Sequence, residues 1–362
     1  MANNKKHILF IGIFLCVLLA PTLVQVTGLE DNIIDNENRT KSDFPKINKK
    51  KPFLFVRKFK SYYKDNFGLR NTFSNNYLRF KNDVLNENSL PNKAIKGSND
   101  FLFLGNSFSN VINESLGFTL FTKQELNQIK TTVLERQEWL SKQNIKFYIA
   151  VAPNKHVVYK ENLPFRFPNL PTRKEQLLDY LKSTINFEII DLGEQFIQQK
   201  KKNRLYRKYD SHWNDLGAFY ATQTLLNSIK KDFDINNINI FSYKIDSLKS
   251  SGGISKMLNF SRNETKIILT PKFKNNVIDL DIPKYYSNQL IYESRHKNPS
   301  KKYKVLLFRD SFSGTLKPFI NHTFRETTFI WSHKFDKDLV LKEKPDLVIM
   351  EYIERYLERL QE

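Results

Sequence analysis

Short apolar runs alternate with longer amphipathic segments from residue 96 onward, and this alternation constrains the fold more than any other feature. A continuous apolar run is typical of a strand covered on both faces, whereas apolar residues at helical spacing indicate a helix lying on a sheet. Repeated strand–helix–strand units predict a mainly parallel sheet between two layers of helices, a three-layer α/β/α fold. The expected strands are 101–105, 145–153, 187–192, 303–308, 327–331 and 346–353.

Two of the expected helices carry start signals. Thr122 is followed three residues later by Glu125, the spacing of a capping box, and Asn214 stands as an N-cap before a second apolar segment. The expected helices are 122–143, 175–183, 214–231, 313–320 and 335–344. Because ligands bind at the carboxyl ends of the strands in such folds, residues that follow the strands are the first candidates for a site.

The apolar run at residues 7–27 is close to the roughly 20 residues that a bilayer core requires. Lys5 and Lys6 precede it, and acidic residues follow it at positions 30, 31, 35 and 37. The positive-inside rule then leaves the N-terminus in the cytoplasm and sends the rest of the chain across the membrane. A cleaved signal peptide is the alternative, since Pro21 lies near the end of the run, but no clear Ala-x-Ala site follows.

We therefore divide the chain into a cytoplasmic tail (1–6), a transmembrane anchor (7–27), a juxtamembrane segment (28–95) and a main domain (96–362). Residues 232–300 of the main domain are polar and lack a regular pattern, which predicts an irregular insertion of mixed structure. The expected location is the cell membrane, with a single span and the main domain on the extracytoplasmic side, in the periplasm or at the cell surface.

The chain is strongly basic, with a formal net charge of +20. Nucleic acid, an anionic polymer or an acidic membrane face would each account for this excess, and so would a general abundance of Lys and Asn. The expected extracytoplasmic location argues against nucleic acid. Cys16 is the only cysteine and no pair of histidines has the spacing of a metal site, so we expect no disulfide within the chain, no metal and no cofactor.

The segment YDSHWNDLGAFYA, residues 209–221, places Asp210 two residues before His212 at the entrance to an expected helix. An aspartate in this position can orient an imidazole and stabilise its protonated form. The same residues would equally suit an Asx turn beside a histidine whose hydrogen bonds are satisfied locally. The segment alone leaves both interpretations open.

Ser311 follows the expected strand 303–308 in the sequence RDSFSG. A serine at such a turn has its side chain exposed, and the amides of the following helix can stabilise an oxyanion. This is the geometry of a nucleophile elbow without its Gly-x-Ser-x-Gly spelling, and a plain N-cap is the alternative. A serine, a histidine and an aspartate on converging loops fit acyl transfer.

On these residues the chain resembles the AlgJ/AlgX-like alginate O-acetyltransferases, SGNH hydrolase-like proteins with an Asp-x-His-Trp motif. The resemblance extends over nearly the whole chain beyond the apolar run. DSHW at 210–213 matches the motif, and RDSFSGTLKPFI at 309–320 is similar to the serine block. The other similar blocks are 37–45, 65–73, 97–105, 151–164 and 351–357.

The resemblance implies a catalytic triad of Ser311, His212 and Asp210, in a circularly permuted order relative to ordinary SGNH hydrolases. Arg309 replaces the glycine of the common Gly-Asp-Ser spelling, while the Asp-Ser pair remains. Backbone amides around Ser311 and Phe312 are expected to hold the oxyanion, with Asn154 and Arg309 as further candidates.

Three aromatic residues are candidates for stacking on sugar faces: Trp213, Trp331 and Tyr352. Packing in the core is the alternative for each of them. With Asn154 and Arg309, Trp213 and Tyr352 make up the predicted substrate-binding residues.

The activity implied is transfer of an acetyl group, through an acyl-serine, onto hydroxyls of an exported polysaccharide. A membrane-bound O-acyltransferase is the expected acyl donor, because acetyl-CoA does not reach an extracytoplasmic domain directly. A polysaccharide acetyl esterase with the same triad is one alternative. A non-catalytic polysaccharide-binding scaffold of an export complex is another.

Overall fold

The structure is a computed structural model that describes residues 2–28, 42–47, 52–85, 87, 90–258, 263–282 and 292–362. The acidic residues at 30–37 and part of the similar block 37–45 lie outside the described residues. The chain forms two compact units: Met1–Ser89 with Ser255–Ser261, and Leu90–Ile254 with Arg262–Glu362.

The first unit begins with a long apolar helix, α1 (Ala2–Thr27). Its segment Lys5–Thr27 has a mean hydropathy of 2.5 and is long enough to cross a membrane, the one such helix among the described residues. Large apolar side chains such as Ile8, Leu9 and Phe10 are exposed along it. The unit also contains α2 (Pro52–Asn66), α3 (Arg70–Arg79) and the π-helical turn Phe80–Val84.

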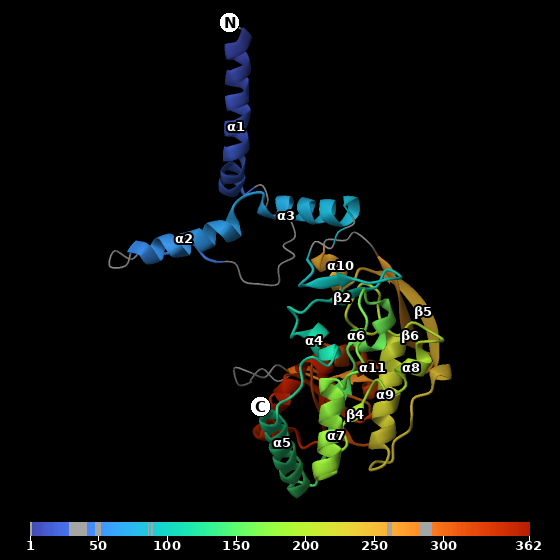
Figure 1. Cartoon of the computed structure of the whole chain (residues 1–362). Helices are drawn as coiled ribbons and strands as arrows, with labels where there is room; N and C mark the ends of the chain where they lie inside the picture. Colours follow the sequence, from blue (N-terminus) through green and yellow to red (C-terminus); the bar gives the residue numbers. More distant parts are fainter. Residues whose placement is uncertain are drawn as a thin grey trace. The chain divides into compact units, whose positions relative to one another are not determined.

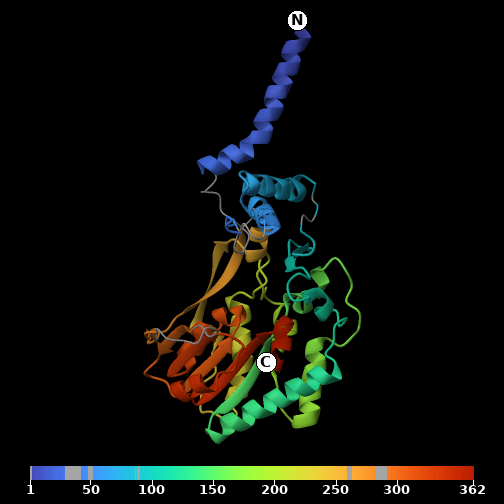
Figure 2. The same ribbon diagram turned by 90° about the vertical axis from the view of Figure 1, so that its left-hand side faces the viewer.

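The second unit is built on a seven-stranded sheet of order β4-β3-β11-β9-β10-β8-β7. The strands from β4 to β10 are parallel, and β8 and β7 extend the sheet antiparallel beyond β10. β11 and β3 lie side by side within it (Figure 2). The strands are β3 (Lys146–Ala152), β4 (Ile190–Asp191), β7 (Ile278–Asp279), β8 (Tyr292–Lys297), β9 (Lys304–Arg309), β10 (Glu326–Trp331) and β11 (Leu347–Ile353).

Helices cover both faces of this sheet, which confirms the predicted three-layer fold. One face packs against α9 (Asp215–Ile229) and α11 (Lys317–Thr323), and the other packs against α5 (Lys123–Lys142), α7 (Arg173–Ile185) and α12 (Lys337–Glu343). α5 lies beside α7 (Figure 1). The shorter helices are α4 (Val111–Ser115), α6 (Lys155–Val158), α8 (Phe196–Gln199) and α10 (Gly253–Met257), with short 3₁₀ segments between them.

The predicted strands and helices are found within a few residues of their expected bounds. Both predicted caps are confirmed: Thr122 and Glu125 form a reciprocal capping box, and Asn214 accepts a hydrogen bond from the amide of Gly217. The predicted strand 101–105 is β2 (Leu102–Leu104), which pairs with β1 (Ala94–Lys96) in a separate two-stranded sheet.

The segment 232–300 is more regular than its sequence suggests. It contains the antiparallel hairpin β5 (Tyr243–Ser250) and β6 (Glu264–Pro271), followed by β7 and β8 at the sheet edge. Most side chains of β5 are exposed, because this hairpin is not covered on both faces. Strands that bury little apolar surface carry no strong hydrophobic pattern, which explains why they were not predicted.

Candidate active site

Ser311 lies at the carboxyl edge of the sheet, just after β9. Asp310 caps the 3₁₀ turn Ser311–Thr315: its Oδ1 accepts the amide of Phe312 at 2.9 Å, and its Oδ2 accepts the amide of Ile353 at 2.7 Å. These two bonds fix the turn to the end of β11. The Ser311 side chain is left partly exposed.

His212 and Asp210 reach the same edge from the loop before α9. His212 Nε2 lies 2.8 Å from Ser311 Oγ, and His212 Nδ1 lies 2.7 Å from Asp210 Oδ1. A proton on Nδ1 facing the carboxylate leaves Nε2 free to accept the serine proton. The structure therefore brings the three predicted residues together, and 32% of the His212 side chain is open to solvent.

Aromatic packing holds the imidazole in place. The Phe312 ring lies 4.8 Å from the His212 ring and 5.0 Å from that of Trp213. Trp213 Nε1 donates a hydrogen bond to the carbonyl of Phe312 at 3.1 Å. The residues that follow Ser311 and His212 in the sequence are thus fixed to each other.

The Asp210 side chain is buried, and hydrogen bonds and an ion pair stabilise its carboxylate. Its Oδ2 accepts the amide of Gly253 at 2.8 Å and pairs with Arg207 Nη1 at 3.0 Å. Burial by itself would raise the pKa of Asp210, but the hydrogen bond and charge of His212, the Gly253 amide and Arg207 hold it below its ordinary value. Asp210 is therefore a carboxylate over the physiological pH range.

Beneath the loop that carries Asp210 lies Lys155, a fully buried lysine. Its Nζ lies within hydrogen-bond distance of four backbone carbonyls, those of Leu102 (2.7 Å), Arg207 (2.7 Å), Lys208 (2.8 Å) and Asp210 (2.9 Å). The rings of Phe101 and Phe103 lie about 5 Å from the same ammonium. Lys155 thus ties the loop 207–210 to β2.

A second buried carboxylate lies under Ser311. Glu351 Oε2 accepts the amide of Asp310 at 3.2 Å and the hydroxyl of Ser313 at 2.8 Å. Burial and the adjacent charge of Asp310 raise the pKa of Glu351 well above its ordinary value. Burial opposes ionisation of Asp310, but His333 and the amides of Phe312 and Ile353 hold its pKa below the ordinary value.

Three of the predicted oxyanion donors already make contacts within the chain. The amide of Phe312 is already donated to Asp310, so it is not free for an oxyanion. Asn154 is 2% exposed, and its Oδ1 accepts a hydrogen bond from Arg355 at 3.3 Å. The Arg309 guanidinium is also buried; it bonds the Asp310 carbonyl, pairs with Glu293 and stacks on the Trp331 ring.

The candidate sugar-stacking residues separate into buried and exposed ones. Trp213 and Tyr352 are 1% and 0% exposed, so neither presents a ring face to a sugar in this structure. Tyr352 instead stacks on His333, with ring centroids 4.5 Å apart. Trp331 is 45% exposed at the end of β10, with the Arg309 guanidinium 4.4 Å from its ring centroid.

Taken together, a partly exposed hydroxyl contacts an imidazole, which in turn contacts an ionised carboxylate. This is the arrangement that activates a serine as a nucleophile. Among the described residues, no group of three or more His, Cys, Asp or Glu side chains is placed to hold a metal ion.

Sequence comparison gives one family. The sequence profile described as "SGNH hydrolase-like domain, acetyltransferase AlgX" matches residues 94–273, a range that includes Asp210 and His212 and ends before Ser311. No curated protein sequence matches the chain significantly.

Three solved structures share the fold. The chain is similar to Bacillus cereus PatB1, with a TM-score of 0.53, 19% identity and coverage of 73% of this chain and 96% of that chain. The same protein with a sulfonyl adduct gives a TM-score of 0.50 at 18% identity, covering 72% and 96%. A DHHW family protein from Eubacterium siraeum gives a TM-score of 0.50 at 13% identity, covering 66% and 86%.

Proposed function

Because the chain belongs to the AlgX/AlgJ family of SGNH hydrolase-like acetyltransferases, we propose that it moves acetyl groups onto hydroxyls of an exported polysaccharide through an acetyl-serine intermediate. The observation that carries this proposal is the series of hydrogen bonds from Asp210 through His212 to Ser311, at 2.7 and 2.8 Å. Its nucleophile and base are both reachable from solvent.

In the first half-reaction, Ser311 Oγ attacks the carbonyl carbon of an acetyl donor while His212 Nε2 accepts the serine proton. The bond from the acetyl carbon to its leaving group breaks, and the leaving group takes that proton from His212. Asp210 holds the imidazole in the tautomer with a proton on Nδ1. With the Phe312 amide engaged, the amide of Ser311 is the backbone donor proposed for the oxyanion.

In the second half-reaction, a sugar hydroxyl attacks the acetyl-serine and gives its proton to His212. The new ester bond forms as the bond from the acetyl carbon to Ser311 Oγ breaks, and His212 returns the proton to Ser311. The partly exposed His212 side chain leaves room for an acceptor at this step. Trp331 is the exposed aromatic at the same edge and the candidate for contact with the acceptor sugar.

The apolar helix α1 supports a location at the membrane with the second unit on the extracytoplasmic side. Acetyl-CoA is a cytoplasmic donor, so the acetyl group has to be handed across the membrane. We propose a multi-spanning membrane-bound O-acyltransferase as the partner that supplies it.

The transferase is distinguished from an esterase by the fate of the acetyl group. The full chain in detergent is incubated with p-nitrophenyl acetate, with and without an oligosaccharide acceptor, and the sugars are analysed by mass spectrometry. We expect acetylated oligosaccharide to form at the expense of free acetate. Acetate release that is unchanged by the sugar, with no acetylated product, would support the esterase instead.

Gly252 packs closely against the loop that carries Asp210, so a substitution there tests whether activity depends on the position of Asp210. A Cβ at this residue would lie 1.9 Å from the carbonyl oxygen of Tyr209 and 2.8 Å from the amide of Asp210, so Gly252→Ala has to move the loop that carries the carboxylate. A displacement of about 1 Å costs on the order of 10²-fold in rate. We expect Gly252→Ala to lower kcat for acetyl ester turnover by about that factor.

Gly253 provides the matched control. A Cβ there would lie 3.5 Å from the nearest Asp210 carboxylate oxygen, which is ordinary van der Waals contact. Gly253→Ala should therefore keep most of the activity. Equal losses in the two variants would show that the segment tolerates no added methyl group and that the loop position of Asp210 is not the cause.

A further inference from the structure

A cavity of the second unit lies far from Ser311. It has a volume of about 610 Å³, within the range of ligand pockets. Its lining is drawn from the segment after α9 (234–239), the base of the β5–β6 hairpin, the segment before β9 (298–302) and the end of α11 (322–323). Lys302 precedes β9 and Ser311 follows it, and a six-residue strand is roughly 20 Å long, so the cavity opens at the opposite edge of the sheet.

The charge of this cavity is positive. Three lysines line it (Lys274, Lys301 and Lys302), against a single carboxylate, Asp234. Lys302 is paired with that carboxylate at 2.7 Å. Within the part of the chain that the structure describes, no ion pair engages Lys274 or Lys301, so the lining keeps a surplus of two positive charges.

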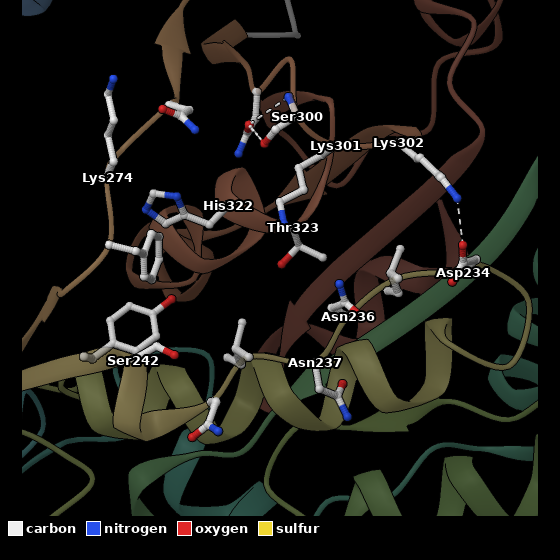
Figure 3. Close-up of a pocket in the computed structure, with 17 residues that line it drawn as sticks. Asp234, Asn236, Asn237, Ser242, Lys274, Ser300, Lys301, Lys302, His322 and Thr323 are labelled. Atoms are coloured by element: carbon white, nitrogen blue, oxygen red, sulfur yellow. Dashed lines mark hydrogen bonds and ion pairs between the residues drawn. The ribbon is translucent and has the colours of Figure 1, made fainter.

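His322 adds an uncharged hydrogen-bonding group to the wall. Burial, together with the positive charge of Lys301, lowers the pKa of His322, so the ring is neutral at pH 7. The Phe273 ring stands edge-on to it, with centroids 5.0 Å apart. Figure 3 shows Lys301 extending toward Thr323 in the middle of the cavity, whereas Lys302 turns aside to Asp234.

The remaining lining has the chemistry of a sugar site. Asparagine amides at 236, 237 and 276 and the hydroxyl of Ser242 can donate to and accept from a hydroxylated ligand. Asn298 is buried, and its amide already bonds Ser300 and Asn321. Phe273 is 41% exposed and offers an apolar surface beside them. Amides and an aromatic ring suit a pyranose, and the two unpaired lysines suit a carboxylate carried by it.

We propose that this cavity binds an acidic saccharide, a sugar unit that carries a carboxylate, at a site separate from the acyl-transfer centre. A polymer long enough to occupy both sites would gain effective concentration at Ser311. Binding in the cavity does not require the chemistry proposed for Ser311; only its link to polymer acetylation rests on the proposed function.

The test measures binding of a galacturonic acid tetramer and a galactose tetramer to the full chain by isothermal titration calorimetry. The double variant Lys274→Glu, Lys301→Glu is compared with Lys182→Glu, Lys201→Glu, which changes the net charge equally at exposed positions outside the cavity. We expect the acidic tetramer to bind more tightly than the neutral one, and the cavity variant to bind it about tenfold more weakly or worse. Hydrolysis of p-nitrophenyl acetate should stay unchanged.

Equal affinity for the two tetramers would overturn the proposal, as would equal weakening by the two double variants. If the double variant does not fold, Lys301→Gln alone must still weaken binding of the acidic tetramer. Failure of acetyl transfer with intact binding would count against the proposed function and not against this site.

Discussion

Ser311→Ala is expected to abolish both acetyl transfer and acetyl-enzyme formation, with kcat for acetyl ester turnover falling on the order of 10⁴ to 10⁶-fold. The hydroxyl is the group that His212 Nε2 contacts at 2.8 Å, and alanine leaves the imidazole with nothing to activate. Intact-mass spectrometry after brief exposure to the acetyl donor should show one added acetyl group on the wild-type chain and none on the variant. A sulfonyl fluoride should likewise label Ser311 and leave the variant unmodified.

Ser211→Ala is the matched control. Its hydroxyl lies 3.5 Å from Nδ1 of the same imidazole, on the side that faces Asp210, so its loss should change kcat by less than about tenfold. Persistent acetylation of the chain in Ser311→Ala would show that another residue is the nucleophile. If the wild-type chain is not acetylated by the donor, and Ser311→Ala leaves polymer acetylation in cells unchanged, the scaffold interpretation is supported.

The sequence predicted the layers of the fold because the strands that build the central sheet are fully covered. Val305–Phe308 and Leu347–Ile353 are buried throughout, and such runs are visible as continuous apolar stretches. The caps at Thr122 and Asn214 were equally predictable, because a cap is a local device of four residues. The exposed hairpin β5–β6 has neither a continuous apolar stretch nor a helix cap, so the sequence did not predict it.

The same limit applies to the site. Asp210, His212 and Ser311 could be selected because each follows a strand or precedes a helix in a short and unusual segment. The geometry that supports them comes from residues distant in the sequence. The amide of Gly253 donates to Asp210, from which it is 43 residues away in the sequence. Glu351 lies below Ser311 and follows it by 40 residues in the sequence. No local sequence pattern identifies such partners. A glutamate such as Glu351 within an apolar strand only interrupts the hydrophobic pattern by which the strand is predicted.

Trp213 and Tyr352 were predicted to bind substrate, and the structure buries both of them. Aromatic residues near a site proposed to modify a polysaccharide suggest a sugar-stacking role, but position along a strand decides which ring reaches solvent. Tyr352 belongs to a strand that is buried on both faces, and Trp213 packs under Phe312. Trp331 closes β10 at the rim of the sheet, so its ring is open on one side.

Lys155→Met is expected to give the second large loss of activity although Lys155 contacts neither Ser311 Oγ nor the His212 ring. Methionine has nearly the length of lysine and fits a fully buried position, but it removes the ammonium that bonds the carbonyls at 102, 207, 208 and 210. The hydrogen bond from the Leu102 amide to the Lys208 carbonyl remains, but the Asp210 segment loses the ammonium that joins it to β2. We expect kcat for acetyl ester turnover to fall by about 10²-fold with little change in KM.

Lys208→Met is the matched control, because it also replaces a lysine by methionine and lies in the loop that Lys155 contacts. Lys208 Nζ lies 5.8 Å from the Phe101 ring and is only half-buried, so its replacement should lower kcat by less than about threefold. If Lys155→Met retained full activity while folding normally, the loop would be held in place without the ammonium, and Lys155 would have no part in positioning Asp210.

The pH profile separates positioning by Lys155 from a general loss of stability. Burial lowers the pKa of Lys155 to about 7, and the nearby charges of Glu264 and Asp210 oppose that shift only in part. The protonated form has three N–H donors for four carbonyls, whereas the neutral amine has two. Activity that depends on the ammonium is therefore present below pH 7 and falls as the pH rises through that value. Wild-type kcat should show this alkaline fall, and Lys155→Met should lack it; an unchanged alkaline limb in the variant would assign the titration to another group.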